Sequence, residues 1–299
     1  MAHAPTRNGT LLEVHYSTET ILKRMAEVPE HNHSRTMTAN GSFTTTTFKE
    51  TIKRVEFGWN GVTDKVTDFG DKLVHLMTNA RPGLNALEFG EDGDWVDIGR
   101  YLDGDSEDCF VSLVEGNPVP VRSLNMIVNI TANCSTRASA LQMRGAAISY
   151  LIDYFRRCGV NINLWAVDAS SCVPMPDGSD RNTLAMFRID TTEGYSLNQL
   201  ASYIALPDFF RRVGFAINEL MTNQASCGSY GRAWDFIEKG KANKQVPQHA
   251  IDVLGGEEAI AKSLYFGMVT DEWDEFDYTV NEICNIIDTF NGVKREEVA

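Results

Sequence analysis

The sequence predicts a mixed α/β fold with a Rossmann-like sheet, flanking helices and an N-terminal helical extension. Residues 125–130 (NMIVNI) and 161–167 (NINLWAV) are short apolar runs typical of buried strands, and residues 138–157 between them carry apolar side chains at helical spacing. Because a short turn joins this helix to the second run, the three segments predict a βαβ unit with parallel strands. A third apolar run at 184–189 (LAMFRI) extends the sheet.

Two helices are expected before this core. Thr47 and Glu50 have the spacing of a capping box, which predicts a helix from Thr47 to about Phe57. Apolar residues at one helical face over 62–76 predict a second helix, so the two form a helical pair.

Two more helices are expected after the third strand. Residues 196–199 (SLNQ) have capping-box spacing and open a helix to about Ala205, and Pro207 suits the first turn of the next helix. Residues 248–254, 257–268 and 280–290 are regular segments that the sequence does not assign to helix or strand.

These patterns divide the chain into three regions. Residues 1–42 have few large apolar side chains after Met25, which predicts a flexible N-terminal arm. Residues 43–120 hold the helical pair and an acidic loop, and residues 121–299 hold the α/β core with an acidic C-terminal segment.

The net charge of the chain disfavours nucleic acid as its main partner. The chain of 299 residues has a formal net charge of −14, concentrated in residues 88–108 and 256–299. A surface of this sign repels phosphates, so nucleic acid is a less favoured partner, although the N-terminal arm could bind it locally. The chain has no apolar run long enough for a membrane span and no secretion signal at its start. We therefore expect no membrane association and a location in the cytoplasm.

Polar side chains follow the predicted strands, where ligands bind in open α/β sheets. Asparagine, threonine, serine and aspartate supply the oxygen ligands that Mg²⁺ prefers, so Mg²⁺ is a possible cofactor. The alternative is that these groups cap the next helix and satisfy local backbone. The candidate binding residues at the strand ends are Asn129, Thr131, Asn133, Asp168, Ser170 and Asp190.

The N-x-T-x-N segment after the first strand resembles the D-x-S-x-S metal motif of the von Willebrand factor A domain. The resemblance places Asn129, Thr131 and Asn133 at the motif and makes Asp190 a possible later acid. It implies a metal site formed by Thr131, Asn133 and Asp190, weakened because asparagine stands where the motif has its first aspartate.

Several blocks over residues 41–220 resemble an uncharacterised family of tailed-bacteriophage proteins. They are GSFTTTTFKETIKRVEFGW, WVDIGRYLDGDSEDCF, MIVNITAN followed by MRGAA, and LPDFFRRVGFA, in this order. The resemblance implies a virus-encoded protein in the cytoplasm of an infected bacterium and favours binding over catalysis.

Three functions remain open at this stage. The preferred one is a non-enzymatic phage accessory protein whose strand-end loops bind a phage or host protein, with homo-oligomerisation possible. The second is a Mg²⁺-dependent phosphate-ester enzyme that uses Asp168 and Asp190 with Ser170 or Thr131. The third is a transcription or replication factor that binds single-stranded nucleic acid through its arm. Arg211 and Arg212 are candidate phosphate contacts, or helix-surface residues that cover apolar groups.

Overall fold

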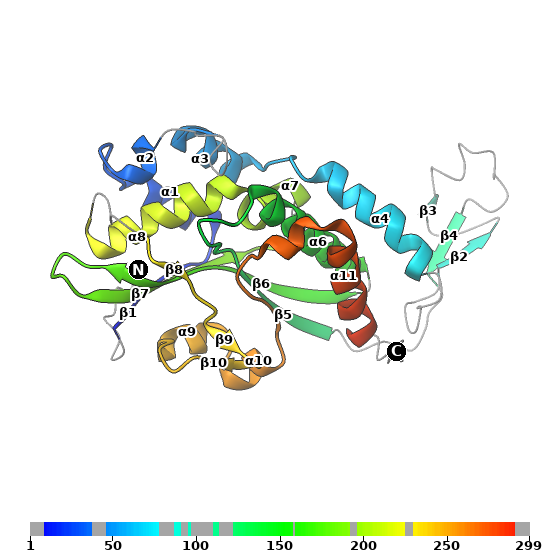
Figure 1. Ribbon diagram of the computed structural model, residues 1–299. Coiled ribbons are helices and arrows are strands. Elements are labelled where there is room, and N and C mark those ends of the chain that lie inside the picture. The colour runs from blue at the N-terminus through cyan, green and yellow to red at the C-terminus, as the bar shows by residue number, and fades with distance from the viewer. Residues whose placement is uncertain are drawn as a thin grey trace.

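The computed structural model shows the expected mixed α/β fold, a central and mostly parallel sheet flanked by helices (Figure 1). The structure describes residues 9–37, 46–77, 87–90, 95–96, 110–113, 122–157, 159–191, 196–224 and 230–290.

The central sheet has the strand order β1-β7-β6-β5-β11. β5 is parallel to both of its neighbours, β6 and β11, and β1 is parallel to β7, whereas β6 and β7 form an antiparallel hairpin. The short β8 pairs with the last part of β6. The strands are β1 (Thr10–His15), β5 (Arg122–Asn129), β6 (Val160–Pro174), β7 (Asp180–Ile189), β8 (Arg232–Ala233) and β11 (Leu264–Phe266).

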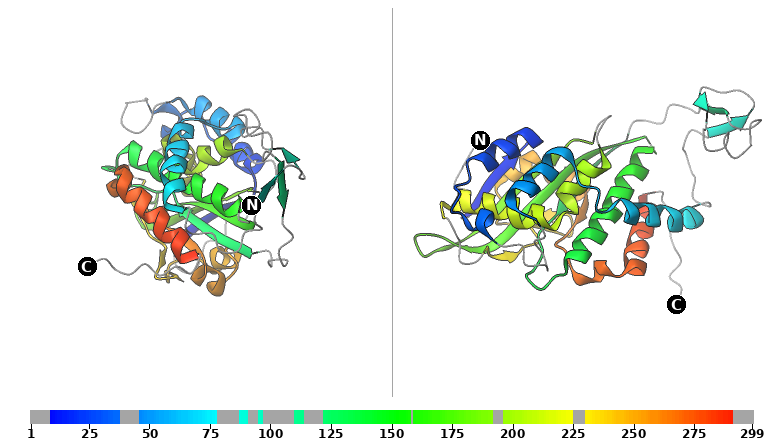
Figure 2. Two further views of the ribbon diagram at one scale, coloured as in Figure 1. Left: turned by 90° about the vertical axis from the view of Figure 1, so that its right-hand side faces the viewer. Right: turned by 90° about the horizontal axis from the view of Figure 1, so that it is seen from above.

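Helices cover both faces of the sheet, and most lie on one of them (Figure 1). On that face, α6 and α11 lie side by side in the views of Figures 1 and 2 and contact each other. The elements of this face are α1 (Thr18–Ala26), α2 (His33–Thr36), α3 (Phe48–Phe57), α4 (Thr63–Met77), α6 (Ala138–Arg157), α7 (Leu197–Ile204), the π-helix η1 (Phe209–Gly214), α8 (Phe215–Thr222), η2 (Asp271–Asp274) and α11 (Phe276–Phe290).

The opposite face carries a smaller layer (Figure 1). It consists of β9 (Ile237–Glu238), β10 (Lys241–Ala242), α9 (Gln248–Val253) and α10 (Glu257–Ala261). A separate antiparallel sheet has the order β2-β4-β3, from β2 (Leu87–Gly90), β3 (Trp95–Val96) and β4 (Phe110–Leu113). The predicted acidic loop contributes these short strands, and its other residues lie outside the described ranges.

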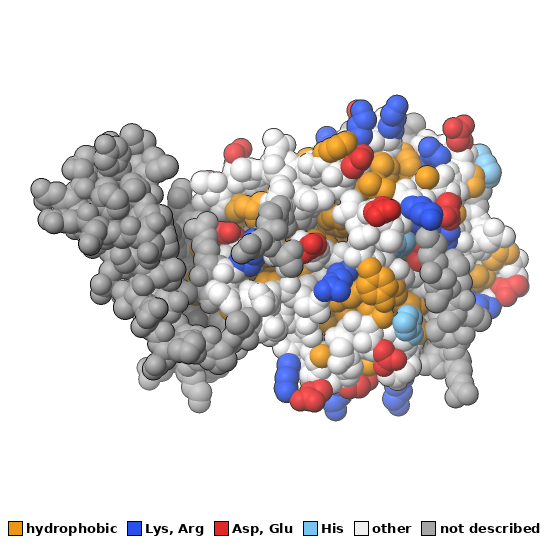
Figure 3. All heavy atoms as spheres, turned by 180° about the vertical axis from the view of Figure 1, so that it is seen from behind, with side chains coloured by type: hydrophobic (Ala, Val, Ile, Leu, Met, Phe, Trp, Pro, Cys, Tyr) orange, Lys and Arg blue, Asp and Glu red, His pale blue; other side chains and the backbone are white. Residues whose placement is uncertain are grey.

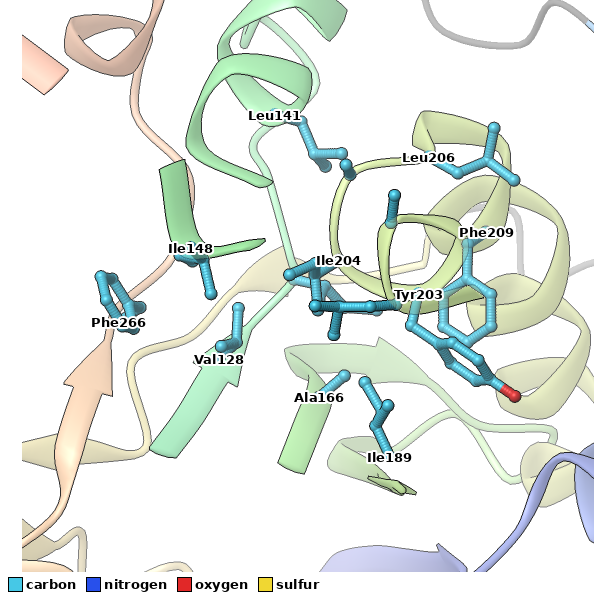
Figure 4. Packing of buried hydrophobic residues seen from close by; sticks show 14 of the residues in the cluster. Val128, Leu141, Ile148, Ala166, Ile189, Tyr203, Ile204, Leu206, Phe209 and Phe266 are labelled. Carbon is cyan, nitrogen blue, oxygen red and sulfur yellow. The ribbon is translucent and has the colours of Figure 1, made fainter. Parts of the chain in front are cut away.

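Two apolar clusters hold the layers together, one on each face of the sheet. In the larger cluster, Val128 of β5 and Ala166 of β6 face Ile148 of α6 and Ile204 of α7 (Figure 4). All four side chains are buried, and full burial of an isoleucine side chain contributes about 1.5–3 kcal/mol. The smaller cluster joins the other face of the sheet to the α9 and α10 layer.

Several predicted elements are confirmed. α6 spans Ala138–Arg157 as expected, and α3 begins at a capping box in which Thr47 and Glu50 exchange hydrogen bonds. Ser196 caps α7 by accepting from the Asn198 N–H. The three unassigned segments are now typed: the first is α9, the second contains α10 and β11, and the third belongs to α11.

The N-terminal region differs from the predicted arm, because residues 10–15 form the edge strand β1. Two buried polar side chains, Glu13 and His15, interrupt the apolar pattern of this strand. Glu13 is compensated by Arg24 of α1, whose Nε and Nη2 donate to the two Glu13 carboxylate oxygens at 2.9 and 3.0 Å. The sequence analysis missed this strand because a buried ion pair takes the place of apolar side chains at part of its buried face.

β6 and β7 extend beyond the predicted runs and form one long hairpin. The added part of the hairpin carries polar side chains, Asp168, Ser170 and Thr183, which are nevertheless buried. Because the strands were predicted from runs of apolar residues, the predicted strands stop where these polar residues begin and are shorter than β6 and β7.

Candidate functional site

The last residue of β5, Asn129, is fully buried and engaged at both ends of its amide. Its Nδ2 donates to the Trp234 carbonyl at 2.9 Å and to Asp235 Oδ1 at 3.3 Å. Its Oδ1 accepts from the Thr131 N–H at 3.1 Å and from the Thr131 hydroxyl. Asn129 thus joins the end of β5 to the segment that follows β8.

The Asp235 carboxylate accepts several hydrogen bonds on this side of the sheet. Its Oδ1 accepts from the Met268 N–H at 2.7 Å and from the Tyr265 hydroxyl at 3.0 Å, in addition to Asn129. Burial and the Asp235 carboxylate raise the pKa of Tyr265 above its usual range, so this hydroxyl stays protonated and donates. The carboxylate therefore fixes β11 and the segment after it beside β5.

Arg144 joins the same two strands from the helical face. It is fully buried on α6, and its Nη2 donates to the Asn129 carbonyl at 2.6 Å while Nη1 donates to the Gly267 carbonyl. Burial lowers the pKa of Arg144 to about 10, so the guanidinium remains charged at neutral pH. One side chain thus links the carboxyl ends of β5 and β11.

The loops that leave these strands are attached to each other. The Val269 N–H donates to the Thr131 carbonyl at 2.9 Å, and the Arg137 N–H donates to Asp271 Oδ1 at 2.8 Å. The Arg137 guanidinium also pairs with Asp274 at 3.1 Å. We call the exposed residues of these loops, Asn133, Ser135, Arg137, Asp271 and Glu272, the strand-end surface.

The structure does not bring all predicted site residues together. Asn129 faces the α9 and α10 layer, whereas Asp168 and Ser170 face the helical layer, because their strand positions point to opposite faces. Asp190 follows β7, which runs antiparallel to β6, so it lies beside the beginning of β6, at the opposite end of the strands from Asn129 and Asp168. The next residue, Thr191, donates to the Ile162 carbonyl there.

The three residues suggested as metal ligands are correspondingly separated. Thr131 is buried against Asn129, and Asn133 is exposed in the loop. Asp190 lies at the opposite end of the strands. Within the described ranges, no three His, Cys, Asp or Glu side chains are grouped to hold a metal ion.

Asp168 is buried with its carboxylate against the π-helix. Burial raises the pKa of Asp168 to about 7, and the Ser170 hydroxyl, 3.5 Å from Oδ1, offsets part of this effect. A Cβ atom added at Gly214 would lie 2.0 Å from Asp168 Oδ2, so only glycine allows this approach.

The two candidate phosphate contacts have structural partners. The Arg212 guanidinium is buried and donates to the carbonyls of Ser34 at 3.0 Å and Thr46 at 2.7 Å. The half-buried Arg211 guanidinium lies 5.5 Å from the Phe210 ring centre and 5.3 Å from that of Phe215, at cation–π distance. Both arginines therefore stabilise packing around the π-helix.

Sequence reasoning missed Arg144, Asp235 and Tyr265. A signal existed for Arg144, because it stands three residues after Leu141 and four before Ile148 on the buried face of α6. A charged residue in the middle of an apolar stripe indicates a buried partner. Asp235 had no such signal, because its segment shows no regular pattern, and the sequence does not assign the segment of Tyr265 to helix or strand.

Comparison with known proteins identifies a family whose function is unknown. No curated protein and no solved structure matches the chain. A protein-family model described as a domain of unknown function (DUF7192) matches residues 6–289.

Proposed function

This chain belongs to the DUF7192 family, and on that premise we propose that it is a non-enzymatic protein that binds another protein through its strand-end surface. The observation that carries the proposal is the attachment of the two exposed loops after β5 and β11 to one rigid network. Binding residues are commonly found on loops that a rigid scaffold positions.

The network supports binding more than catalysis. The suggested Mg²⁺ enzyme needs Asp168 and Asp190 in one site. Asp168 is buried under the helical layer, whereas Asp190 lies beside the beginning of β6, at the opposite end of the strands. The amide of Asn129 is engaged by protein groups on both sides, so its role is architectural. What the network presents to solvent is the strand-end surface.

The charge of this surface favours a partner with a basic face. Its exposed carboxylates, Asp271 and Glu272, lie beside Arg137, and the exposed Glu275 follows them just before the last helix. Opposite charges across an interface accelerate association and fix its orientation. On the face shown in Figure 3, basic side chains are interspersed with acidic ones, which does not favour a nucleic-acid surface.

The wider setting is part of the proposal. The sequence blocks that resemble tailed-bacteriophage proteins support a phage accessory protein in the host cytoplasm, with a phage or host protein as its partner. The N-x-T-x-N segment begins at the last residue of β5, an inner and parallel strand of the sheet, which supports an A-domain-like core. In the described part of the chain, each helix is too short or too polar to cross a membrane.

A charge-reversal experiment tests the proposal. The variant Ser135→Arg/Glu272→Lys changes the strand-end surface, and Glu257→Lys/Ala261→Arg makes the same changes at exposed positions of α10. Tagged wild type and both variants are used to capture partners from infected bacteria, with quantification by mass spectrometry.

We expect a protein partner that the wild type and the α10 variant retain and that the strand-end variant loses at least tenfold, equivalent to about 1.4 kcal/mol. Equal capture by all three proteins would contradict the proposed surface. Nuclease-sensitive nucleic acid as the main captured material would contradict the proposed class of partner.

A further inference from the structure

We propose that Asp168, Ser170, Thr183 and Asn218 form a buried binding site for a monovalent cation, K⁺ or Na⁺, between the β6–β7 hairpin and α8. This cation cluster is separate from the strand-end surface and does not depend on the proposed protein binding.

Strand register places three members of the cluster together. Asp168 and Ser170 lie on the same face of β6, and Thr183 of β7 is directly opposite Ser170 in the antiparallel pair. Asp168 is opposite Ala185, whose small side chain leaves the carboxylate uncovered by its cross-strand neighbour. The three polar groups therefore share one side of the hairpin.

The helical layer supplies the fourth member. Gly214 contacts Asp168, and Asn218 follows it by four residues, one turn along α8 on the same side. α8 packs on β7 and β1, and the Asn218 side chain is buried.

All four side chains are nearly inaccessible to solvent, at 1–3% exposure. Three of their polar atoms nevertheless have no hydrogen-bond partner among the residues that the structure describes: Asp168 Oδ2, Thr183 Oγ1 and Asn218 Nδ2. A buried polar atom without a partner costs about 1–3 kcal/mol, and a charged one costs more. Three such atoms in one layer indicate a bound species that completes their interactions.

The chemistry of the donors selects the species. Asp168, Ser170 and Thr183 present oxygen atoms, and a half-turn of the Asn218 amide exchanges its N–H₂ group for a fourth oxygen. Hard cations prefer oxygen ligands. The cluster has one carboxylate, which one positive charge neutralises, whereas Mg²⁺ or Ca²⁺ would leave an excess buried charge.

Two other buried carboxylates on this side of the sheet, Glu13 and Glu219, already have partners. Glu13 of β1 faces the same layer opposite Ala185, and Arg24 neutralises it through two hydrogen bonds. On α8, Glu219 accepts hydrogen bonds from Ser34 and Tyr230 instead of pointing to the hairpin. The Asp168 carboxylate is therefore the group that a cation would neutralise.

The test compares urea unfolding in KCl, NaCl and N-methylglucamine chloride at equal ionic strength and slightly alkaline pH. The proteins are the wild type, Asp168→Asn, Thr183→Val and Ser149→Ala, the last removing a buried hydroxyl from α6 outside the cluster. Broadening of the ²³Na resonance gives a direct readout of sodium binding.

We expect K⁺ or Na⁺ to lower the unfolding equilibrium constant of the wild type about tenfold when present at ten times its dissociation constant. Ser149→Ala should keep this response, Thr183→Val should weaken it and Asp168→Asn should abolish it together with the sodium broadening. Equal stability in the three salts, or an unchanged response in both cluster variants, would overturn the proposal. If Asp168→Asn does not fold, Thr183→Val still decides between these results.

Discussion

Replacing Asn129 with aspartate is the most informative single change, because aspartate is the residue with which the A-domain metal motif begins. In the structure, Asn129 Nδ2 is a donor to the Trp234 carbonyl and to Asp235 Oδ1. The variant Asn129→Asp replaces this donor with a carboxylate oxygen that faces two acceptors. We therefore expect a loss of stability instead of a gain of metal binding.

The size of the loss follows from two contributions. The acceptors that lose their donor are buried polar groups, and each costs about 1–3 kcal/mol when unsatisfied. An uncompensated buried charge costs about 3–5 kcal/mol, and these contributions overlap. We expect Asn129→Asp to lower the free energy of unfolding by about 3–5 kcal/mol at neutral pH, a large part of the 5–15 kcal/mol typical of a folded domain.

The loss should depend on pH in a defined direction. Burial beside Asp235 raises the pKa of the introduced carboxyl in the folded state above its unfolded value. The folded state then holds its proton more tightly, so stability is retained at low pH and lost as pH rises through the folded pKa. A protonated carboxyl also restores the missing donor.

Urea unfolding at about pH 5 and about pH 8 measures both effects. Asn133→Asp is the matched control, because its amide is exposed in the same loop and its loss should stay within about 0.5 kcal/mol. Millimolar Mg²⁺ should not restore Asn129→Asp. Selective restoration by Mg²⁺, or a stability equal to that of the control, would refute the architectural role of Asn129.

Three further predictions concern packing, capping and a buried ion pair. Gly145→Ala should destabilise by about 1–3 kcal/mol in thermal unfolding, because its Cβ would lie 2.3 Å from Ala205 Cβ; an unchanged Tm would contradict this helix contact. Thr47→Ala should lower the free energy of unfolding, measured in urea, by about 1 kcal/mol, and an unchanged value would show that the capping box is dispensable. Burial raises the pKa of Glu13, but interactions with His15 and Arg24 outweigh it and leave the pKa lowered. Glu13→Gln should therefore cost about 3–5 kcal/mol at neutral pH, with the deficit fading as pH falls through the folded pKa; a pH-independent deficit would oppose this account.

The core of the fold could be predicted from the sequence because its local signals agree with its packing. The α6 stripe and the apolar runs of β5 and β6 identify the βαβ unit without tertiary information. The Thr47–Glu50 capping box marks the beginning of α3 because it is formed within four consecutive residues. Such features depend on near neighbours, which a sequence displays directly.

The remaining fold depends on pairs that are distant in sequence. β1 joins the sheet although Glu13 and His15 break its apolar pattern, because Arg24 compensates the buried carboxylate. Because β7 runs antiparallel to β6, Asp190 lies at the opposite end of the strands from Asp168. Local sequence patterns do not indicate the direction of a strand. The sequence therefore located polar strand ends but could not show which of them meet.

The candidate site shows the same division. The first predicted strand is β5, and Asn129 is its last residue, where its Oδ1 accepts from the Thr131 N–H. Their partners Asp235 and Tyr265 lie more than a hundred residues away, in segments that the sequence does not assign to helix or strand. A polar residue at a strand end indicates where a network begins, and its distant partners decide whether it binds a ligand or holds the fold.

Hydrogen–deuterium exchange on the captured complex shows which surface of the protein the partner covers. The amides of residues 133–137 and 271–275 belong to the strand-end loops, and those of residues 248–262 belong to the α9 and α10 layer on the other face. We predict that binding slows exchange in the two strand-end segments and leaves residues 248–262 unchanged. Slower exchange over residues 248–262 with unchanged strand-end loops would contradict the account.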